Sequence, residues 1–215
     1  MEIVANLLCR AIHIFEIHNL NPFGRMSSAE TMQQLHELYG FAIFPQSMAD
    51  INLEKGADFE SGRFGGIAID KLTIYQNGLS VDTRSSTEDS EAVCLNVLEE
   101  ARKRLAATVV VTRRHFVNQF SFRSDMKLAR LNPVLANIAE RVSRELKSDL
   151  RQDFNVDLSA VKISADLSQV RVSPGLFSIE RRENVPYSEN TYFSSAPLRS
   201  ALHMQLVEEF EKSLE

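Results

Sequence analysis

The sequence predicts an α+β fold: a two-layer sandwich of a mixed, largely antiparallel sheet with about four helices. Runs that alternate apolar and polar residues and are joined by tight turns indicate antiparallel strand pairs. Longer runs with apolar residues three and four apart indicate single helices between these pairs. The elements do not alternate strictly between strand and helix, which argues against a parallel sheet. We expect a single domain over residues 1–215, with loop excursions at about 46–66 and 183–196.

The N-terminal region predicts a strand followed by a helix. Residues 10–17 alternate as a strand would, and a helical start over 2–9 is an alternative for the residues before them. Ser27 and Glu30 have the spacing of a capping box, so a helix is expected to begin there. Gly40 is expected to end this helix, because glycine adopts the left-handed conformation of a helix C-terminus without strain.

A β-hairpin is the clearest local signal. Asn77-Gly78 separates the β-rich runs Ile67–Tyr75 and Leu79–Thr83, and Asn-Gly favours a type I′ turn because both turn residues need positive φ. Phe41–Phe44 is expected to be a short strand before it. Further strands are predicted at 108–112, 116–122, 161–165, 169–172 and 176–181. We find no internal sequence repeat.

Three more helices follow from caps and periodicity. One is expected over 87–106, with acidic residues in its first turn and basic residues in its last turn. Asn132-Pro133 predicts the start of the longest helix, which runs to about residue 151. Its apolar stripe consists of Val134, Ile138, Val142, Leu146 and Leu150. Ser195 before Pro197 is expected to open the last helix. Periodicity leaves open whether such stripes are buried within one chain or shared across an interface.

Composition excludes several classes of protein. The chain has 215 residues, of which 44% are hydrophobic and 25% charged, and this is typical of a soluble globular protein rather than a disordered or fibrous one. The net charge is −5, but the charge is segregated. Residues 102–151 carry 12 basic and 4 acidic side chains, whereas residues 1–101 carry 6 and 15. A globally acidic protein is disfavoured as a general nucleic-acid binder.

The cysteines and the N-terminus predict an intracellular protein. Cys9 and Cys94 lie in apolar contexts outside any CxxC motif, which favours buried free thiols in a reducing compartment. The apolar start carries Glu2 and Arg10 and is a poor match to a signal peptide. No run reaches the ~20 apolar residues of a membrane span. We therefore expect a cytoplasmic protein, or one inside a host cell, without a membrane partner.

The basic segment 102–130 is the first candidate binding region. Its cationic residues surround Phe116, Phe120 and Phe122, and cations around aromatic rings can hold phosphates and stack bases. The alternative is a solvated or interface surface. The candidate anion-binding residues are Arg113, Arg114, His115, Arg123, Lys127 and Arg130.

Two loops are candidates for contacting a protein partner. Arg63 and Phe64 lie at the expected tip of the glycine-rich stretch within 46–66. Tyr187 and Tyr192 lie in the polar loop 183–196, whose Tyr, Ser and Asn composition suits an adaptable contact surface. Simple packing of these aromatic residues onto the domain is the alternative.

No catalytic motif is found. The sequence has no P-loop, no GxSxG elbow and no HExxH motif, and it predicts no metal site and no cofactor. His115, Asp125 and Lys127 are the residues that a metal-dependent phosphodiesterase would use.

Three functional hypotheses follow. The favoured one is a non-catalytic binding or assembly protein, a homo-oligomer in which the basic 102–130 surface meets an acidic surface of another copy. The second is binding of a nucleotide or nucleic acid by the basic segment. The third is the phosphodiesterase-like enzyme.

Overall fold

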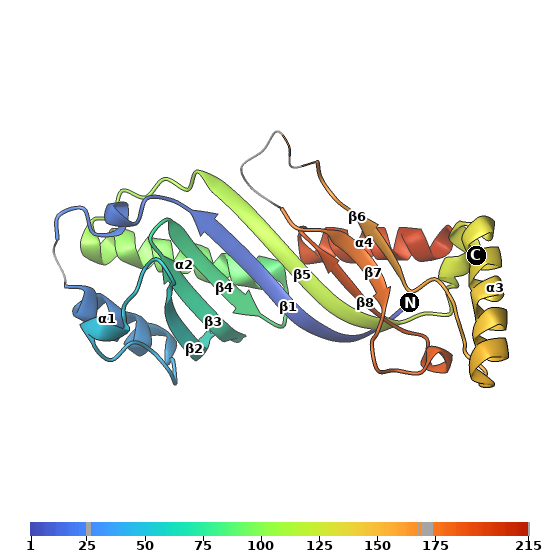
Figure 1. Cartoon of the computed structure of the whole chain (residues 1–215). Helices are drawn as coiled ribbons and strands as arrows, with labels where there is room; N and C mark the ends of the chain where they lie inside the picture. The colour runs from blue at the N-terminus through green and yellow to red at the C-terminus, as the bar shows by residue number, and fades with distance from the viewer. Residues whose placement is uncertain (25–26, 167, 169–173, 215) are drawn as a thin grey trace. The chain divides into compact units, whose positions relative to one another are not determined.

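The computed structural model describes residues 1–24, 27–166, 168 and 174–214, and confirms the α+β class. Within these residues it has four α-helices and eight strands (Figure 1). The first half of the chain contains β1 (Glu2–Ile14), α1 (Ser28–Tyr39), β2 (Ala57–Phe64), β3 (Ile67–Tyr75), β4 (Gly78–Thr83) and α2 (Thr87–Leu105). The second half contains β5 (Arg113–Arg123), α3 (Pro133–Leu150), β6 (Ala160–Ile163), β7 (Phe177–Arg181), β8 (Thr191–Ala196) and α4 (Ser200–Lys212).

The order of elements is repeated. A strand, a helix, three strands and a helix occur first as β1 to α2 and again as β5 to α4. The strands follow the order β2-β3-β4-β1-β5-β8-β7-β6, so in each half the first strand lies next to the last of the three. The sequence shows no repeat, and the repetition is therefore one of topology rather than of side chains.

The chain falls into two compact units. The N-terminal unit consists of Asn6–Asn118 with Pro197–Ser200. The C-terminal unit consists of the described residues of Met1–Ala5, Gln119–Ala196 and Ala201–Glu215. Each unit has its own hydrophobic core. The organisation as one domain stays a prediction.

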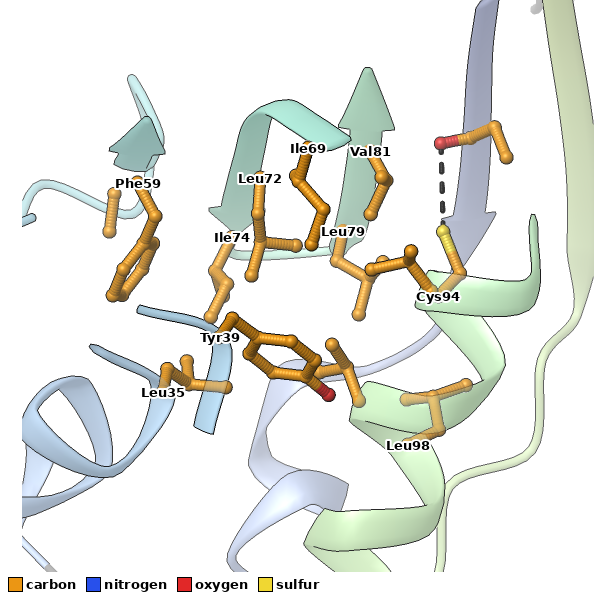
Figure 2. Close-up of a cluster of buried hydrophobic side chains, with 14 of the residues drawn as sticks. Leu35, Tyr39, Phe59, Ile69, Leu72, Ile74, Leu79, Val81, Cys94 and Leu98 are labelled. Carbon is orange, nitrogen blue, oxygen red and sulfur yellow. Dashed lines mark hydrogen bonds between the residues drawn. The ribbon is translucent and has the colours of Figure 1, made fainter. Parts of the chain in front are cut away.

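The core of the N-terminal unit is formed by both of its helices and its strands. Figure 2 shows Leu35 and Tyr39 of α1 and Leu98 of α2 meeting the side chains of β3 and β4. Tyr39 also donates a hydrogen bond from its hydroxyl to Oδ1 of Asn96 on α2, at 2.7 Å. Helix α1 is thus held by apolar burial and by a polar contact to the neighbouring helix.

The core of the C-terminal unit contains one of its two helices. Phe120 and Phe122 of β5, Ile179 of β7, Tyr192 of β8 and Val207 of α4 are fully buried. No residue of α3 belongs to this core among the described residues. Helix α4 is therefore the helix that covers this core.

The helix caps confirm the sequence predictions. The capping box of Ser27 and Glu30 is formed, and Gly40 ends α1 in the left-handed conformation at φ 62°. Asn132 caps α3 by accepting hydrogen bonds from the backbone N–H groups of Val134 and Leu135. Caps depend on residues within one turn of each other, which explains why the sequence predicts them well.

Several predicted elements were wrong because pairing partners far along the chain decide them. Strand β1 begins at Glu2, so the alternative of a helical start over 2–9 is excluded. Phe41–Phe44 makes only one isolated bridge, between Ile43 and Glu60. The run 108–112 is not a strand, since Thr108 and Thr112 donate their N–H groups to the Asn19 and Ile14 carbonyls instead.

The two predicted loops both contain a strand. The stretch 46–66 includes β2, and 183–196 includes β8, which also contains Ser195, so the last helix starts only at Ser200. Gly62 does not loosen β2. A Cβ there would lie 2.4 Å from the Phe41 ring, so glycine permits a close approach. The predicted strand 169–172 lies outside the described residues.

The hairpin between β3 and β4 is confirmed, but its turn is not type I′. The two loop residues are Gln76 and Asn77, and neither has positive φ. Gly78 begins β4 at φ 151°, where a Cβ would lie 2.2 Å from the carbonyl oxygen of His13. Glycine is required at that position by the neighbouring strand β1.

Candidate interaction surface

Helix α3 exposes an apolar face. Four large aliphatic side chains lie at helical spacing on one side of the helix. Val134 is 64% exposed, Leu135 41%, Ile138 53% and Val142 42%. No residue of α3 is buried. These four residues form what we call the α3 face. An exposed cluster of this kind is typical of a surface that another structure covers.

The opposite side of α3 makes only light contacts with its own unit. Ala136, Ala139 and Ser143 are half-buried there, and Ser143 donates a hydrogen bond to the carbonyl of Phe154 at 2.7 Å. Figure 1 shows α3 to one side of β6, β7 and β8. The side chains of the α3 face therefore point away from the unit, whereas Leu146 is half-buried together with the small residues.

A second uncovered apolar surface lies on the helix side of the C-terminal sheet. Val161 on edge strand β6 packs against the core, and Ile163, two residues later on the same side of the strand, is 62% exposed. On α4, Leu202 is 44% exposed and Leu206 half-buried. We call Ile163, Leu202 and Leu206 the β6–α4 surface. In the N-terminal unit, by contrast, the edge strand β2 buries Ala57 and Phe59 completely.

The structure distributes the six candidate anion-binding residues over both units. Arg113, Arg114 and His115 begin β5 in the N-terminal unit, whereas the other three belong to the C-terminal unit: Arg123, Lys127 and Arg130. Arg114 lies 3.4 Å from the Glu91 carboxylate, and Arg130 donates a 2.6 Å hydrogen bond to the carbonyl of Leu214. Two of these six residues therefore already contact acceptors within the chain.

Arg123 and Arg130 line a cleft in the C-terminal unit of about 720 Å³. The same cleft contains the carboxylates of Glu2, Asp125, Glu189 and Glu211. Ser124 donates a 2.5 Å hydrogen bond to Glu211, and Asn190 donates one to Asp125 at 3.2 Å. Acids and bases offset each other here, so the lining does not favour a phosphate over other ligands.

The four candidate partner-contact residues differ in exposure. Arg63 is exposed at the end of β2, and Phe64 next to it is half-buried, with its ring 6.2 Å from the Tyr39 ring. Tyr187 is half-buried beneath the Arg181 guanidinium, 4.4 Å from its ring centroid. Tyr192 is fully buried and donates a hydrogen bond to the Met126 carbonyl at 2.8 Å. Tyr192 is thus a core residue rather than a surface contact.

Glu91 is the centre of a charged cluster that the sequence did not indicate. Its carboxylate lies 2.6 Å from Arg199 and 3.9 Å from Nε2 of His13. His13 is fully buried, and neither ring nitrogen has a hydrogen-bond partner among the described residues. Burial, and secondarily the nearby Arg114, lower the His13 pKa, so the ring is neutral near pH 7. His13 is thus a neutral ring packed beside the Glu91 carboxylate, which is already paired with arginine. We interpret this cluster as structural.

Ser194 and His203 form a serine–histidine pair that sequence spacing did not reveal. The Ser194 hydroxyl lies 2.8 Å from Nε2 of His203 and donates to the carbonyl of Ser178, also at 2.8 Å. Both residues are fully buried, and burial lowers the His203 pKa to about 4. The hydroxyl proton is engaged by a backbone carbonyl and no solvent reaches the pair, so we interpret it as structural.

The thiols and carboxylates form no recognisable metal centre. Cys9 and Cys94 are buried free thiols, as the sequence predicts. In the described part of the chain, no group of three His, Cys, Asp or Glu side chains is placed to hold a metal ion. None of the described helices is long and apolar enough to cross a membrane.

The sequence matches no protein-family model. It matches no curated protein either. The surfaces described above therefore carry the functional proposal.

Proposed function

We propose that this protein is a non-catalytic assembly protein that associates with a second copy of itself through the α3 face. The observation that carries the proposal is that four large aliphatic side chains on one side of α3 are each at least 41% exposed. Full burial of such a side chain is worth about 1.5–3 kcal/mol, so covering the exposed half of each stabilises a complex by about 1 kcal/mol per side chain.

A second copy is a suitable partner because this chain also offers the complementary surface. Ile163 and Leu202 are large apolar side chains that the C-terminal unit leaves uncovered on the helix side of its sheet. Each copy in a symmetric dimer contributes both surfaces, so the gain is doubled. Contact between segregated charges, the form of self-association expected from the sequence, is the competing explanation.

Light scattering on a size-exclusion column tests this proposal. We expect the wild-type chain to have twice its mass of 24.3 kDa at high protein concentration, at low and at high salt alike. Ile138→Asp places a charge in the α3 face and should give a monomer. Asn137→Asp adds the same charge on the neighbouring exposed residue, outside the face, and should leave the dimer intact.

Two results would overturn the proposal. One is a wild-type chain that is monomeric at every concentration. The other is a dimer that dissociates in high salt but survives Ile138→Asp, because screening weakens contacts between charges and not apolar ones.

The binding of a phosphate-bearing ligand by the basic segment stays a prediction, since the mixed lining of the cleft adds no support to it.

A further inference from the structure

We infer that the two copies exchange helix α3, so that the α3 face of one copy covers the β6–α4 surface of the other. This inference rests on the proposed self-association and specifies its geometry. The repeated topology, the connections on either side of α3 and the charged residues beside the two surfaces support it.

The N-terminal unit shows what occupies this position in the repeated fold. Helix α1, which corresponds to α3 in the element order, packs against its unit with Leu35 and Tyr39 buried. Leu35 and Leu38 of α1 face Val97 and Ala101 of α2 across a small cleft. A helix thus covers the sheet beside α2, whereas beside α4 the C-terminal unit leaves Leu202 exposed.

The connections around α3 are shorter than those around α1 and are anchored. Nine residues join β5 to α3 and nine join α3 to β6, whereas 13 and 17 residues flank α1. Leu128, before α3, is fully buried in the core, and Asp157, after it, accepts a 2.9 Å hydrogen bond from Arg181. Gly40 and Gly56, both with positive φ, lie in the connection after α1, but residues 124–159 contain no glycine.

These anchored, glycine-free connections hold α3 with its apolar face turned away from its own core. The same feature favours exchange of α3 with an identical chain. The partner offers its β6–α4 surface, which corresponds to the surface that α1 covers within the N-terminal unit. Because the exchange is reciprocal, each copy buries its α3 face and its β6–α4 surface. Neither surface is then left for a third copy to bind.

Charged residues border both surfaces. Arg141 follows Ile138 by three residues and Glu145 follows Val142 by three, so the α3 face has one cation and one anion beside it. On α4, Glu209 follows Leu206 by three residues and borders the β6–α4 surface. All three side chains are exposed. Covering one surface with the other allows Arg141 of one copy to pair with the partner's Glu209.

Crosslinking of two variants that each carry one added cysteine tests the exchange. Chains with Ile138→Cys and with Leu202→Cys are co-expressed with different tags and treated with a short bis-maleimide, with buried Cys9 and Cys94 left in place. We expect a covalent dimer that carries both tags. Glu140→Cys replaces Ile138→Cys in the matched control, because Glu140 is exposed on the opposite side of α3, and should give at least tenfold less product.

The remaining outcomes separate this inference from the proposed function. Covalent dimers of the Ile138→Cys chain alone would show that α3 pairs with α3, which overturns the exchange but retains self-association. A crosslink within one chain carrying both substitutions, together with a monomeric mass, would overturn both. A dimer by light scattering with no crosslink between the two positions would overturn the exchange only.

Discussion

The two units repeat one topology but use their first helix differently. Helix α1 buries Leu35 and Tyr39 in its own core, whereas α3 is longer and has no fully buried residue. Both helices carry apolar residues at helical spacing, so amphipathicity does not separate them. The two helices differ in their connections. Those of α1 are longer and contain glycines, and those of α3 are shorter and anchored at both ends. The two helices therefore differ in burial and in their connections, although both are amphipathic.

The largest expected effect is a difference in stability between matched truncations on the two helices. Leu35→Ala removes a buried side chain and should lower the free energy of unfolding by about 2–5 kcal/mol. Ile138→Ala removes an exposed one and should change the stability of the dilute monomer by less than about 0.5 kcal/mol. Urea unfolding at low protein concentration measures both. Equal losses would mean that α3 packs within its own chain.

A smaller effect is expected from the buried histidine of the C-terminal unit. The His203 pKa of about 4 lies below the ordinary value of 6.5, so between these pH values the unfolded chain binds the proton more readily. Stability is therefore complete above pH 6.5 and falls as the pH drops, by about 2 kcal/mol at pH 5.

Urea unfolding at pH 7 and at pH 5 compares the wild-type chain with His203→Leu. The variant should lose the part of the pH dependence that comes from His203 and keep the part from His13 of the N-terminal unit, whose pKa burial also lowers. An unchanged pH dependence in the variant would contradict the assignment of His203 as a buried neutral ring.

The sequence predicts those features that depend on neighbouring residues. The caps at Ser27 and Asn132 and the hairpin between β3 and β4 follow from contacts only a few positions apart. The α3 stripe was also predicted, but its exposure was not, because burial depends on which distant segment covers a helix. Tyr192 illustrates the same limit: its polar neighbours are typical of a loop, yet pairing of β8 with β7 places it in the core.

We propose that the α3 face is covered only when two copies meet. Hydrogen exchange over a dilution series tests it most directly, because α1 provides an internal reference in the same sample. We predict that backbone amides of α3 become more protected as the protein concentration rises through the dimerisation range, while those of α1 stay equally protected throughout. Protection of α3 that does not depend on concentration would contradict the account.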